Sequence, residues 1–257
     1  MSFSVTKKLM AYAVATAKDA GDAIMEIYKT NFNVRSKDDD SPVTEADEKG
    51  EALIRTRLEN AYPEIPFIGE EAYSAGHKPD VDGGLFWLVD ALDGTKEFIN
   101  RRGEFTVNIA LIHAGVPVFG VVHAPAKHRT FWGAISHGAF AANGGSEPHE
   151  ITTRAPKPDG LVVVASRSHR SGEDEFLKKF TIKETVTTGS SLKFCLIAAG
   201  EADIYPRMGP TSEWDTAAGH AVLLAAGGQM TQIDGSPFVY GKDDIRNPHF
   251  IAQGQPN

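Results

Sequence analysis

The N-terminal part of the chain shows two helical patterns of apolar positions. Apolar or small residues recur at about every third or fourth position from Val5 to Tyr28, which predicts one long helix. Lys7 and Lys8 before an apolar run also resemble the start of a signal peptide, but the helical pattern continues beyond that run. After a polar loop at residues 36–42, a second helix is predicted over residues 43–61.

The middle of the chain has the pattern of β-strands. Two short apolar segments, at residues 65–71 and 85–95, are predicted as strands that break into loops. Residues 105–135 alternate, carry many β-branched side chains and contain the turn pair Ala114-Gly115, so we expect an antiparallel meander. His113, His123 and His128 fall in this meander with a spacing that fits no common zinc pattern, and we interpret them as ordinary sheet residues.

The C-terminal part alternates between strand and helix. Its predicted elements are a strand at 161–169, a helix at 191–200, a strand at 202–207 and a helix at 214–228. Glycine and polar residues at 143–150 mark a boundary, so we divide the chain into an α+β part at 1–145 and an α/β part at 146–257. A length of 257 residues suits one large domain or two modest ones with a common core.

Composition narrows the class of protein. The formal net charge of −8 argues against binding of nucleic-acid polymers, which requires a basic footprint. Cys195 is the only cysteine, so an intramolecular disulfide is excluded and a reducing compartment is the natural expectation. The apolar run "GHAVLLAAGG" is far shorter than the roughly 20 residues that a membrane span requires. We expect a cytoplasmic protein, with peripheral attachment to the inner membrane as the alternative.

The segment "FWLVDALDGTKEF" places two acids at the end of an apolar strand. Asp90 follows a run that should be buried on both faces, and burying a carboxylate without a partner is costly. Asp90 and Asp93, with the carbonyl of Leu92, could bind a hard cation. Gly94 and Thr95 have two explanations that we leave open at this point. They form a simple Asp-Gly turn, or they start a helix whose free N–H groups bind an anion.

Other acids lie where an apolar segment gives way to a loop or helix start. Each has an ordinary explanation: Glu70 and Glu71 as a solvated pair, Asp215 as a helix N-cap, and Thr44 with Asp47 as a capping box. If Glu70, Asp90, Asp93 and Asp215 converge, however, they cannot all be ionised without cations between them. Two Mg²⁺ ions would neutralise the carboxylates and leave room for substrate oxygens.

These motifs carry a family resemblance over essentially the whole chain. "WLVDALDGTKEF", "GEEA" and "WDTAAG" resemble the signature set of the lithium-sensitive, magnesium-dependent inositol monophosphatase superfamily. "SPVTEAD", "DGTKEFINRRGEFTVNIALI", "SRSH" and "TGSSLKFCLIAAGEADIYPR" are more similar to its 3′(2′),5′-bisphosphate nucleotidases of the CysQ type. The resemblance implies a layered α/β/α/β/α sandwich of mixed α+β and α/β character.

The resemblance also implies a metal site with two or three Mg²⁺ ions. Glu70, Asp90 and the Leu92 carbonyl would hold one ion, and Asp90, Asp93 and Asp215 a second. Glu70 would reach a third ion through water. One residue departs from the family pattern: Ala91 stands where the family has proline. Alanine leaves the unfolded loop less restricted, at an expected loss of roughly 0.4–1 kcal/mol in stability, and removes no ligand.

The catalytic and phosphate-binding roles follow from the same resemblance. Gly94 and Thr95 would offer N–H groups to the reacting phosphate, and Thr95, oriented by Asp47, would help position the attacking water. Glu70 completes the catalytic set. Phosphoryl transfer requires charge neutralisation and positioning more than covalent chemistry, which agrees with these assignments.

The choice of substrate rests on residues away from the metal site. Inositol phosphatases usually carry an acid where Lys193 stands, whereas lysine suits a second phosphate. Arg207 would add a donor, and both cations have the alternative explanation of solvated surface charges. The remaining expected contacts are Ser166, Arg167, Ser168, His169 and Ser190.

Together these features predict a phosphatase that converts adenosine 3′,5′-bisphosphate to AMP in sulfate assimilation and nucleotide recycling. The sulfated nucleotide PAPS is a further candidate substrate. An inositol monophosphatase is the alternative within enzymes, and a catalytically weak nucleotide- or metal-binding protein is the alternative of another class. We expect a monomer or homodimer whose partner is a small phosphate ester.

Overall fold

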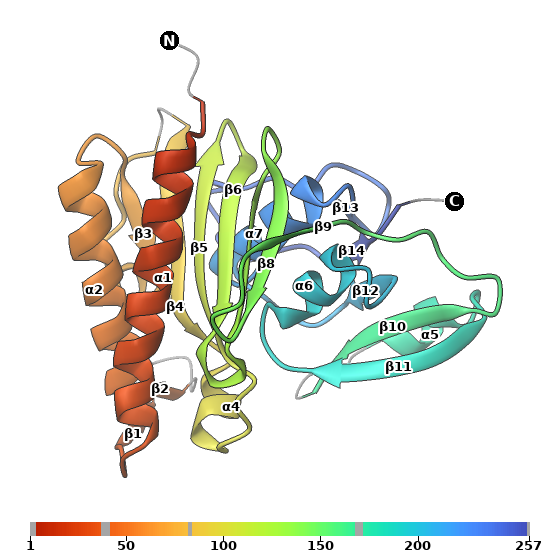
Figure 1. Cartoon of the computed structure of the whole chain (residues 1–257), viewed down its shortest axis with the longest axis horizontal. Helices are drawn as coiled ribbons and strands as arrows, with labels where there is room; N and C mark the ends of the chain where they lie inside the picture. The colour runs from red at the N-terminus through yellow and green to blue at the C-terminus, as the bar shows by residue number, and fades with distance from the viewer. Residues whose placement is uncertain (1–3, 37–41, 82–83, 168–171, 256–257) are drawn as a thin grey trace.

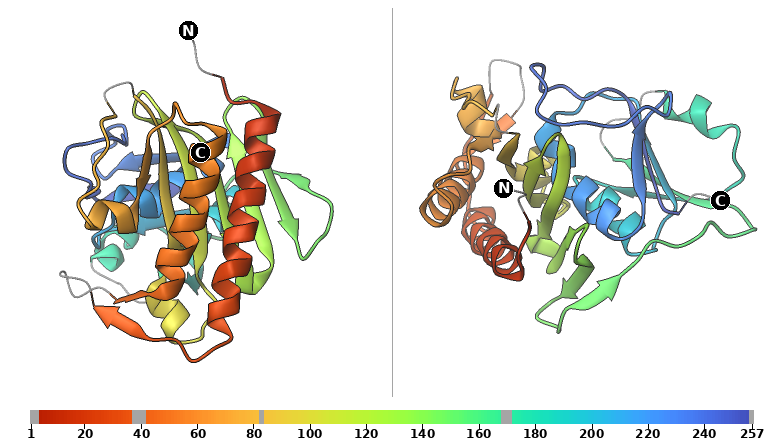
Figure 2. Two further views of the ribbon diagram at one scale, coloured as in Figure 1. Left: turned by 90° about the vertical axis from the view of Figure 1, so that its left-hand side faces the viewer. Right: turned by 90° about the horizontal axis from the view of Figure 1, so that it is seen from above.

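The computed structural model describes residues 4–36, 42–81, 84–167 and 172–255. Its elements form five layers: two long helices, a large sheet, two central helices, a smaller sheet and a short outer helix (Figures 1 and 2). This is the predicted α/β/α/β/α sandwich. None of the helices in the described part of the chain has the length and hydrophobicity needed to cross a bilayer.

The outer helices are α1 (Lys7–Tyr28) and α2 (Glu45–Ala61), as the helical patterns predict. Each begins at a threonine cap: the Thr6 side chain accepts a hydrogen bond from Leu9 N, and Thr44 forms a capping box with Asp47. Both helices pack their apolar faces against the large sheet, where the largest fully buried side chain is Trp87. A two-stranded ribbon, β1 (Val34–Ser36) with β2 (Pro42–Thr44), precedes α2.

The large sheet contains the predicted meander. In spatial order its strands are β3 (Phe67–Gly69), β4 (Leu85–Asp93), β5 (Thr106–His113), β6 (Val116–Ala124), β7 (Arg129–Ala134), β8 (Gly138–Asn143) and β9 (His149–Ile151). All neighbours are antiparallel except β3 and β4. The turn between β5 and β6 uses Ala114 and Gly115, both with positive φ, as expected for a tight hairpin. Three short helical segments interrupt this half: α3 (Glu70–Ser74), α4 (Thr95–Ile99) and the 3₁₀ turn η1 (Pro125–Lys127).

The smaller sheet is mixed and lies on the other side of the central helices. In spatial order it contains β11 (Ile182–Thr188), β10 (Leu161–Ser166), β12 (Ile204–Arg207), β14 (Phe250–Gln253) and β13 (Gln229–Gln232). The central layer is formed by α6 (Leu192–Ala198) and α7 (Glu213–Ala225), and α5 (Glu173–Leu177) lies beyond the sheet.

The α7 helix is buried nearly all round because it lies between the two sheets. Its Ala217, Ala218 and Gly219 allow close approach: Gly219 leaves no room for a Cβ beside Phe194, and Gly120 of β6 leaves none beside Ala218. One hydrophobic cluster joins both sheets through this helix. The predicted boundary at residue 145 falls between β8 and β9, which pair with each other. The division into two parts remains a prediction.

Candidate metal centre and phosphate site

A cavity of about 330 Å³ lies where β4, α4, α6 and α7 meet. It is lined by most of the site residues that the sequence predicts: Glu70, Asp90, Leu92, Asp93, Gly94, Thr95, Ser166, Ser190, Lys193, Arg207 and Asp215. Asp47 lies behind this wall, hydrogen-bonded to Thr95. Ser168 and His169 lie outside the described residues.

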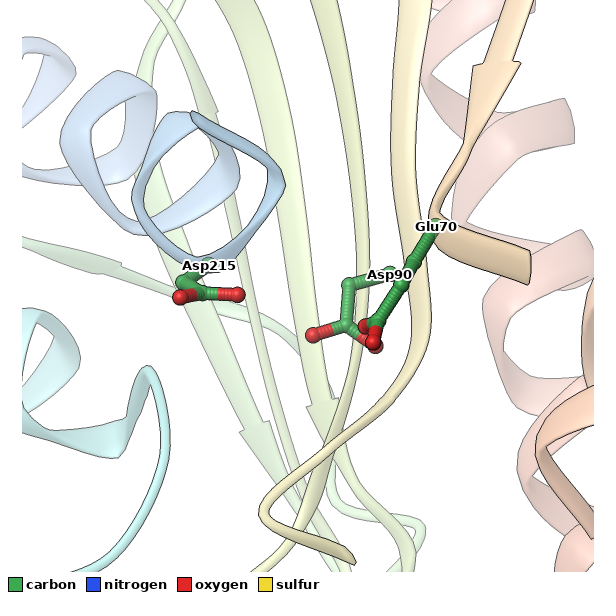
Figure 3. Close-up of side chains that lie close together, drawn as sticks. All are labelled: Glu70, Asp90 and Asp215. Carbon is green, nitrogen blue, oxygen red and sulfur yellow. The ribbon is translucent and has the colours of Figure 1, made fainter. Parts of the chain in front are cut away.

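Three carboxylates converge at one end of the cavity. Glu70, Asp90 and Asp215 each offer an oxygen, and these oxygens lie within 4.8 Å of one another (Figure 3). They come from the junction of β3 and α3, from β4 and from the first turn of α7. Burial, reinforced by the charges of Asp93 and Glu70, raises the pKa of Asp215 to about 8. Burial and the Glu70 charge likewise hold the pKa of Asp90 well above its usual range. Such mutual repulsion is what a bound cation relieves.

A β-bulge places Asp90 and Asp93 on the same side of β4. Asp90 lies opposite Asn108 of β5, whereas Asp93 lies opposite Thr106, so β4 contains one extra residue. Because side chains alternate along a strand, two residues three positions apart would otherwise face opposite sides. The sequence predicts that the strand breaks after Asp90, but β4 continues through Asp93.

Asp93 lies beside the three-carboxylate cluster but is not one of its members. Its Oδ2 accepts hydrogen bonds from Ser191 N at 2.7 Å and from Asn108 Nδ2 at 3.3 Å. Burial raises the pKa of Asp93, while the Lys193 ammonium partly offsets that rise. Asp93 therefore connects the acidic end of the cavity to the loop before α6.

Glu70 is held in place by a buried acid on α2. The Glu51 carboxylate accepts hydrogen bonds from Glu71 N at 2.7 Å and Ala72 N at 2.8 Å, at the start of α3. Gly69 has no room for a side chain, because a Cβ there would lie 2.5 Å from the Glu51 carboxyl carbon. Sequence reasoning missed Glu51. Its burial could have been predicted from its i+4 spacing from Asp47, which places it on the face of α2 that also carries Ile54 and Leu58.

The N-cap of α7 is Ser212 and not Asp215 as predicted; Asp215 is the third residue of the helix and a member of the cluster. Its Oδ2 accepts a hydrogen bond from Ser212 N at 2.8 Å, which completes a capping box at the start of α7. The Ser191 hydroxyl donates to Asp215 O at 2.7 Å and accepts from Asn108 Nδ2 at 3.0 Å. Asn108 and Ser191 were also missed, although a buried asparagine in an apolar strand is itself a signal.

The segment after Asp93 starts a helix. Gly94 has φ of 95°, a left-handed conformation that favours glycine, and α4 begins at Thr95. The alternative of a simple turn between two strands is therefore wrong. The Thr95 hydroxyl lies 3.1 Å from Asp47 Oδ1 and 3.3 Å from the Leu92 carbonyl oxygen. The capping box at Asp47 is confirmed and coexists with this contact.

Lys193 and Arg207 are both buried, so the alternative of solvated surface charges is wrong. Lys193 Nζ donates to Ser190 O at 2.6 Å, and burial lowers the pKa of Lys193 to about 8. Arg207 donates to Gly209 O and Pro210 O at 3.2 and 3.1 Å, respectively. Both residues line the cavity, so the acidic end and two cations share one space.

Ser190 lines the cavity, whereas Arg167, which the sequence also predicts as a contact, is not among the described residues that line it. The Ser190 hydroxyl is buried and has no hydrogen-bond partner in the described structure, and its backbone has φ of 52°. Arg167 instead forms an ion pair with Glu104, whose carboxylate also accepts Gly189 N at 3.1 Å. This pair therefore holds the loop that presents Ser190.

The histidines of the meander form no metal site with other described residues. His113 and His123 lie in strands, as predicted. His128 does not: it follows η1 in a left-handed conformation, with φ of 52°. Burial lowers the pKa of His123 to about 4, and its ring lies 2.9 Å from the Thr130 hydroxyl.

Comparisons with known proteins agree with this geometry. The model of the inositol monophosphatase family matches residues 6–255. The 3′(2′),5′-bisphosphate nucleotidase CysQ of Escherichia coli O6:H1 is 45% identical over 238 residues, which cover 91% of this chain and 95% of that protein. The crystal structure of CysQ from Bacteroides thetaiotaomicron superposes with a TM-score of 0.83 at 38% identity, covering 98% of each chain.

A more distant structure shares the fold. An inositol monophosphatase from Zymomonas mobilis superposes with a TM-score of 0.78 at 26% identity, covering 98% of this chain and 94% of its own. The family model and the relatives cover nearly the whole chain. This protein is therefore a member of the inositol monophosphatase family.

Proposed function

We propose that the protein is a magnesium-dependent 3′(2′),5′-bisphosphate nucleotidase. It would remove the 3′-phosphate of adenosine 3′,5′-bisphosphate to give AMP, and PAPS is a candidate second substrate. The observation that carries the proposal is the meeting, in one cavity, of a three-carboxylate cluster with the buried cations Lys193 and Arg207. The likeness to the CysQ nucleotidases supports the same choice.

The residues at the acidic end fit a magnesium site. Glu70, Asp90 and Asp215 are hard oxygen donors that lie close together. The pKa values of Asp90 and Asp215 are raised by burial and by the neighbouring negative charges. Asp93 accepts hydrogen bonds from described residues only at Oδ2, which leaves Oδ1 for a ligand, and the Leu92 carbonyl can accept more than one contact. Bound Mg²⁺ would neutralise phosphate charge and favour ionisation of water. We assign two or three ions to this set.

The hydroxyl of Thr95 and the carboxylate of Asp47 would handle the attacking water. Burial raises the pKa of Asp47, which makes this carboxylate a better proton acceptor than an exposed aspartate. Thr95 lies between Asp47 and the cavity, so its hydroxyl can pass on the orientation set by that carboxylate. Gly94, without a side chain, would let the reacting phosphate approach the first N–H groups of α4.

The second phosphate would lie at the cationic end. Lys193 and Arg207 supply positive charge there, and the Ser190 hydroxyl, which has no partner among the described residues, supplies a donor. Ser166 lines the same cavity, and His169 remains a candidate from the sequence. An inositol monophosphate carries no second phosphate to occupy this end, which ranks that alternative lower.

The alternative of a catalytically weak binding protein makes a different prediction. A binding module does not need a hydroxyl held by a buried carboxylate beside the acidic cluster. We expect Asp93→Asn to abolish turnover and leave the fold intact, since asparagine can still accept from Ser191 N. Turnover that survives this substitution would contradict the metal assignment.

The reaction itself is tested by its product. Purified protein is incubated with adenosine 3′,5′-bisphosphate, with Mg²⁺ or with excess EDTA, and the nucleotides are separated by chromatography. The proposal predicts AMP with its phosphate on the 5′ position, and no product in EDTA. Release of the 5′-phosphate, or equal turnover in EDTA, would contradict it.

A further inference from the structure

One arginine lining the cavity belongs to none of the motifs discussed above. Arg246 lies in the segment between Tyr240 and β14, and it contributes to the same cavity as the carboxylate cluster, Lys193 and Arg207. Unlike those two cations, Arg246 is exposed, so it lies at the solvent side of the cavity. Its position is therefore accessible to a substrate that extends outward from the metal centre.

The backbone at Arg246 is fixed to the start of α7. Arg246 forms an antiparallel bridge with Ser212, and its two neighbours are tied as well. Glu213 N donates to Ile245 O at 2.9 Å, and Asn247 N donates to Thr211 O at 2.9 Å. The backbone of Arg246 is thus bridged to Ser212, which lies three residues before the cluster member Asp215. This attachment limits where the Arg246 side chain can reach.

Further contacts make this attachment rigid. The Asn247 side chain donates to Ser212 O at 2.6 Å, and the fully buried Glu213 carboxylate accepts Gly241 N at 2.7 Å and Lys242 N at 3.2 Å. A buried charge with several donors is costly to disturb. The segment that carries Arg246 is therefore part of the cavity wall.

The Arg246 guanidinium differs from the other arginines in the described part of the chain. Each of the others contacts a carboxylate, a carbonyl oxygen or an aromatic ring. Among described residues, Arg246 makes only the hydrogen bond of its backbone N–H, to Asp244 Oδ1 at 2.9 Å. Its side chain has no hydrogen bond or ion pair with described residues, including the acids of the cluster. Its charge and its donors remain available to a ligand.

Arg207 and Arg246 both contact the segment at residues 209–212. Arg207 donates to the carbonyl oxygens of Gly209 and Pro210, while Arg246 is bridged to Ser212, two residues further along. Lys193 and Arg207 each donate hydrogen bonds to backbone carbonyl oxygens. An anion at this end of the cavity would therefore gain an additional fork of N–H donors from Arg246.

We propose that Arg246 is a specificity-determining residue that binds the second anionic group of the substrate, the one that is not hydrolysed. The inference rests on the proposed function, and it names the 5′-phosphate of a nucleoside bisphosphate as the group recognised. Arg246 would act on substrate choice and leave the reacting phosphate to the metal end of the cavity.

The test compares two nucleotides that share the base and the reacting 3′-phosphate. Adenosine 3′,5′-bisphosphate carries the second phosphate, and adenosine 3′-monophosphate lacks it. For Arg246→Gln, kcat/KM on the bisphosphate should fall by about 10- to 100-fold, the usual range for a lost hydrogen bond to a charged group. Activity on the monophosphate should stay unchanged. Arg246→Lys should recover part of the loss, since it keeps the charge without the planar fork.

Arg55→Gln is the matched control, because this arginine pairs with Glu59 on α2 and does not line the cavity. Equal loss on both nucleotides would overturn the inference, because it would indicate base stacking or a folding defect. An unchanged preference would also overturn it. If the unaltered protein prefers the bisphosphate and Arg246→Gln keeps that preference, only the inference about Arg246 fails. If the unaltered protein hydrolyses neither nucleotide, the proposed function fails as well.

Discussion

The Thr95 hydroxyl donates a hydrogen bond to Asp47 Oδ1 at 3.1 Å, although the two residues lie 48 positions apart. Oδ2 of the same carboxylate accepts from Thr44 N at 2.8 Å and from Thr44 Oγ1 at 2.7 Å. Asp47 thus caps α2 with one oxygen and holds the hydroxyl at the start of α4 with the other. A capping residue and a positioning residue are here the same side chain.

This double role separates activity from stability. Asp47→Asn keeps a carbonyl acceptor for the cap but removes the proton acceptor, so we expect kcat to fall by about 10²- to 10⁴-fold. The melting temperature should change little. Thr6→Ala serves as control: it removes the cap of α1, costing about 1 kcal/mol of stability, and should leave kcat unchanged. Full activity in Asp47→Asn would exclude this carboxylate from the reaction.

The carboxylate cluster predicts opposite effects with and without metal. Asp90→Asn removes one of the close like charges, so in EDTA the variant should melt at a higher temperature than the unaltered protein. Added Mg²⁺ should raise the melting temperature of the unaltered protein and have little effect on the variant. The exposed Glu184→Gln should respond to Mg²⁺ like the unaltered protein. Equal Mg²⁺ responses in all three proteins would place the metal elsewhere.

Ala91 lies in the bulge of β4, where proline is tolerated. Ala91 and Leu92 have no paired positions on β5, and Gly50 of α2 faces Ala91 without a side chain. Ala91→Pro should therefore raise the free energy of unfolding by roughly 0.4–1 kcal/mol, because it restricts the unfolded chain. Urea denaturation measures this change. A loss of stability together with activity would show that the bulge does not accept the proline φ angle.

Two buried histidines predict weakening of the fold in mild acid. Burial lowers the pKa of His123 to about 4 and that of His220 to about 3, below the ordinary value of 6.5. Between these values the unfolded chain binds the proton and the folded chain does not, so stability falls as pH drops below 6.5. At pH 5 the loss is on the order of 2 kcal/mol for each histidine.

The contribution of His123 is isolated by difference. Urea denaturation of the unaltered protein and of His123→Gln, from pH 7.5 to 5, should show a shallower pH dependence in the variant. The carboxylate cluster is common to both proteins, so its titration cancels in the difference. His149→Gln is the control, since His149 is exposed at the edge of the sheet. Parallel pH curves for all three proteins would contradict the account.

Local patterns predicted many of the elements because their causes are local, but α5, β11, β13 and β14 were not predicted. The helical spacing of α1, the capping box at Thr44 and the Ala114-Gly115 hairpin each depend on residues a few positions apart. The identity of the main metal candidates was also accessible, because Asp90 and Asp215 sit at element ends that the sequence marks. The layered sandwich followed from the family resemblance and not from any of these patterns.

Features that depend on distant partners could not be predicted in this way. The bulge between Asp90 and Asp93 is defined only by the register against β5. The burial of Lys193 depends on how α6 packs, and the approach of Arg246 to the cavity depends on a bridge to a residue 34 positions earlier, at Ser212. Glu51 looks like an ordinary surface acid of α2 until α3 is placed beside it.

We infer that one cavity combines a magnesium site with a cationic site for a second phosphate. The most direct test is kcat/KM for adenosine 3′,5′-bisphosphate and inositol 1-phosphate, measured side by side in Mg²⁺. We expect a preference for the nucleotide of at least about 100-fold, since Lys193 and Arg207 line the cavity and inositol 1-phosphate has no second phosphate to contact them. A preference for inositol 1-phosphate would contradict the assignment of the cationic end, and activity on neither would favour the weak-binding alternative.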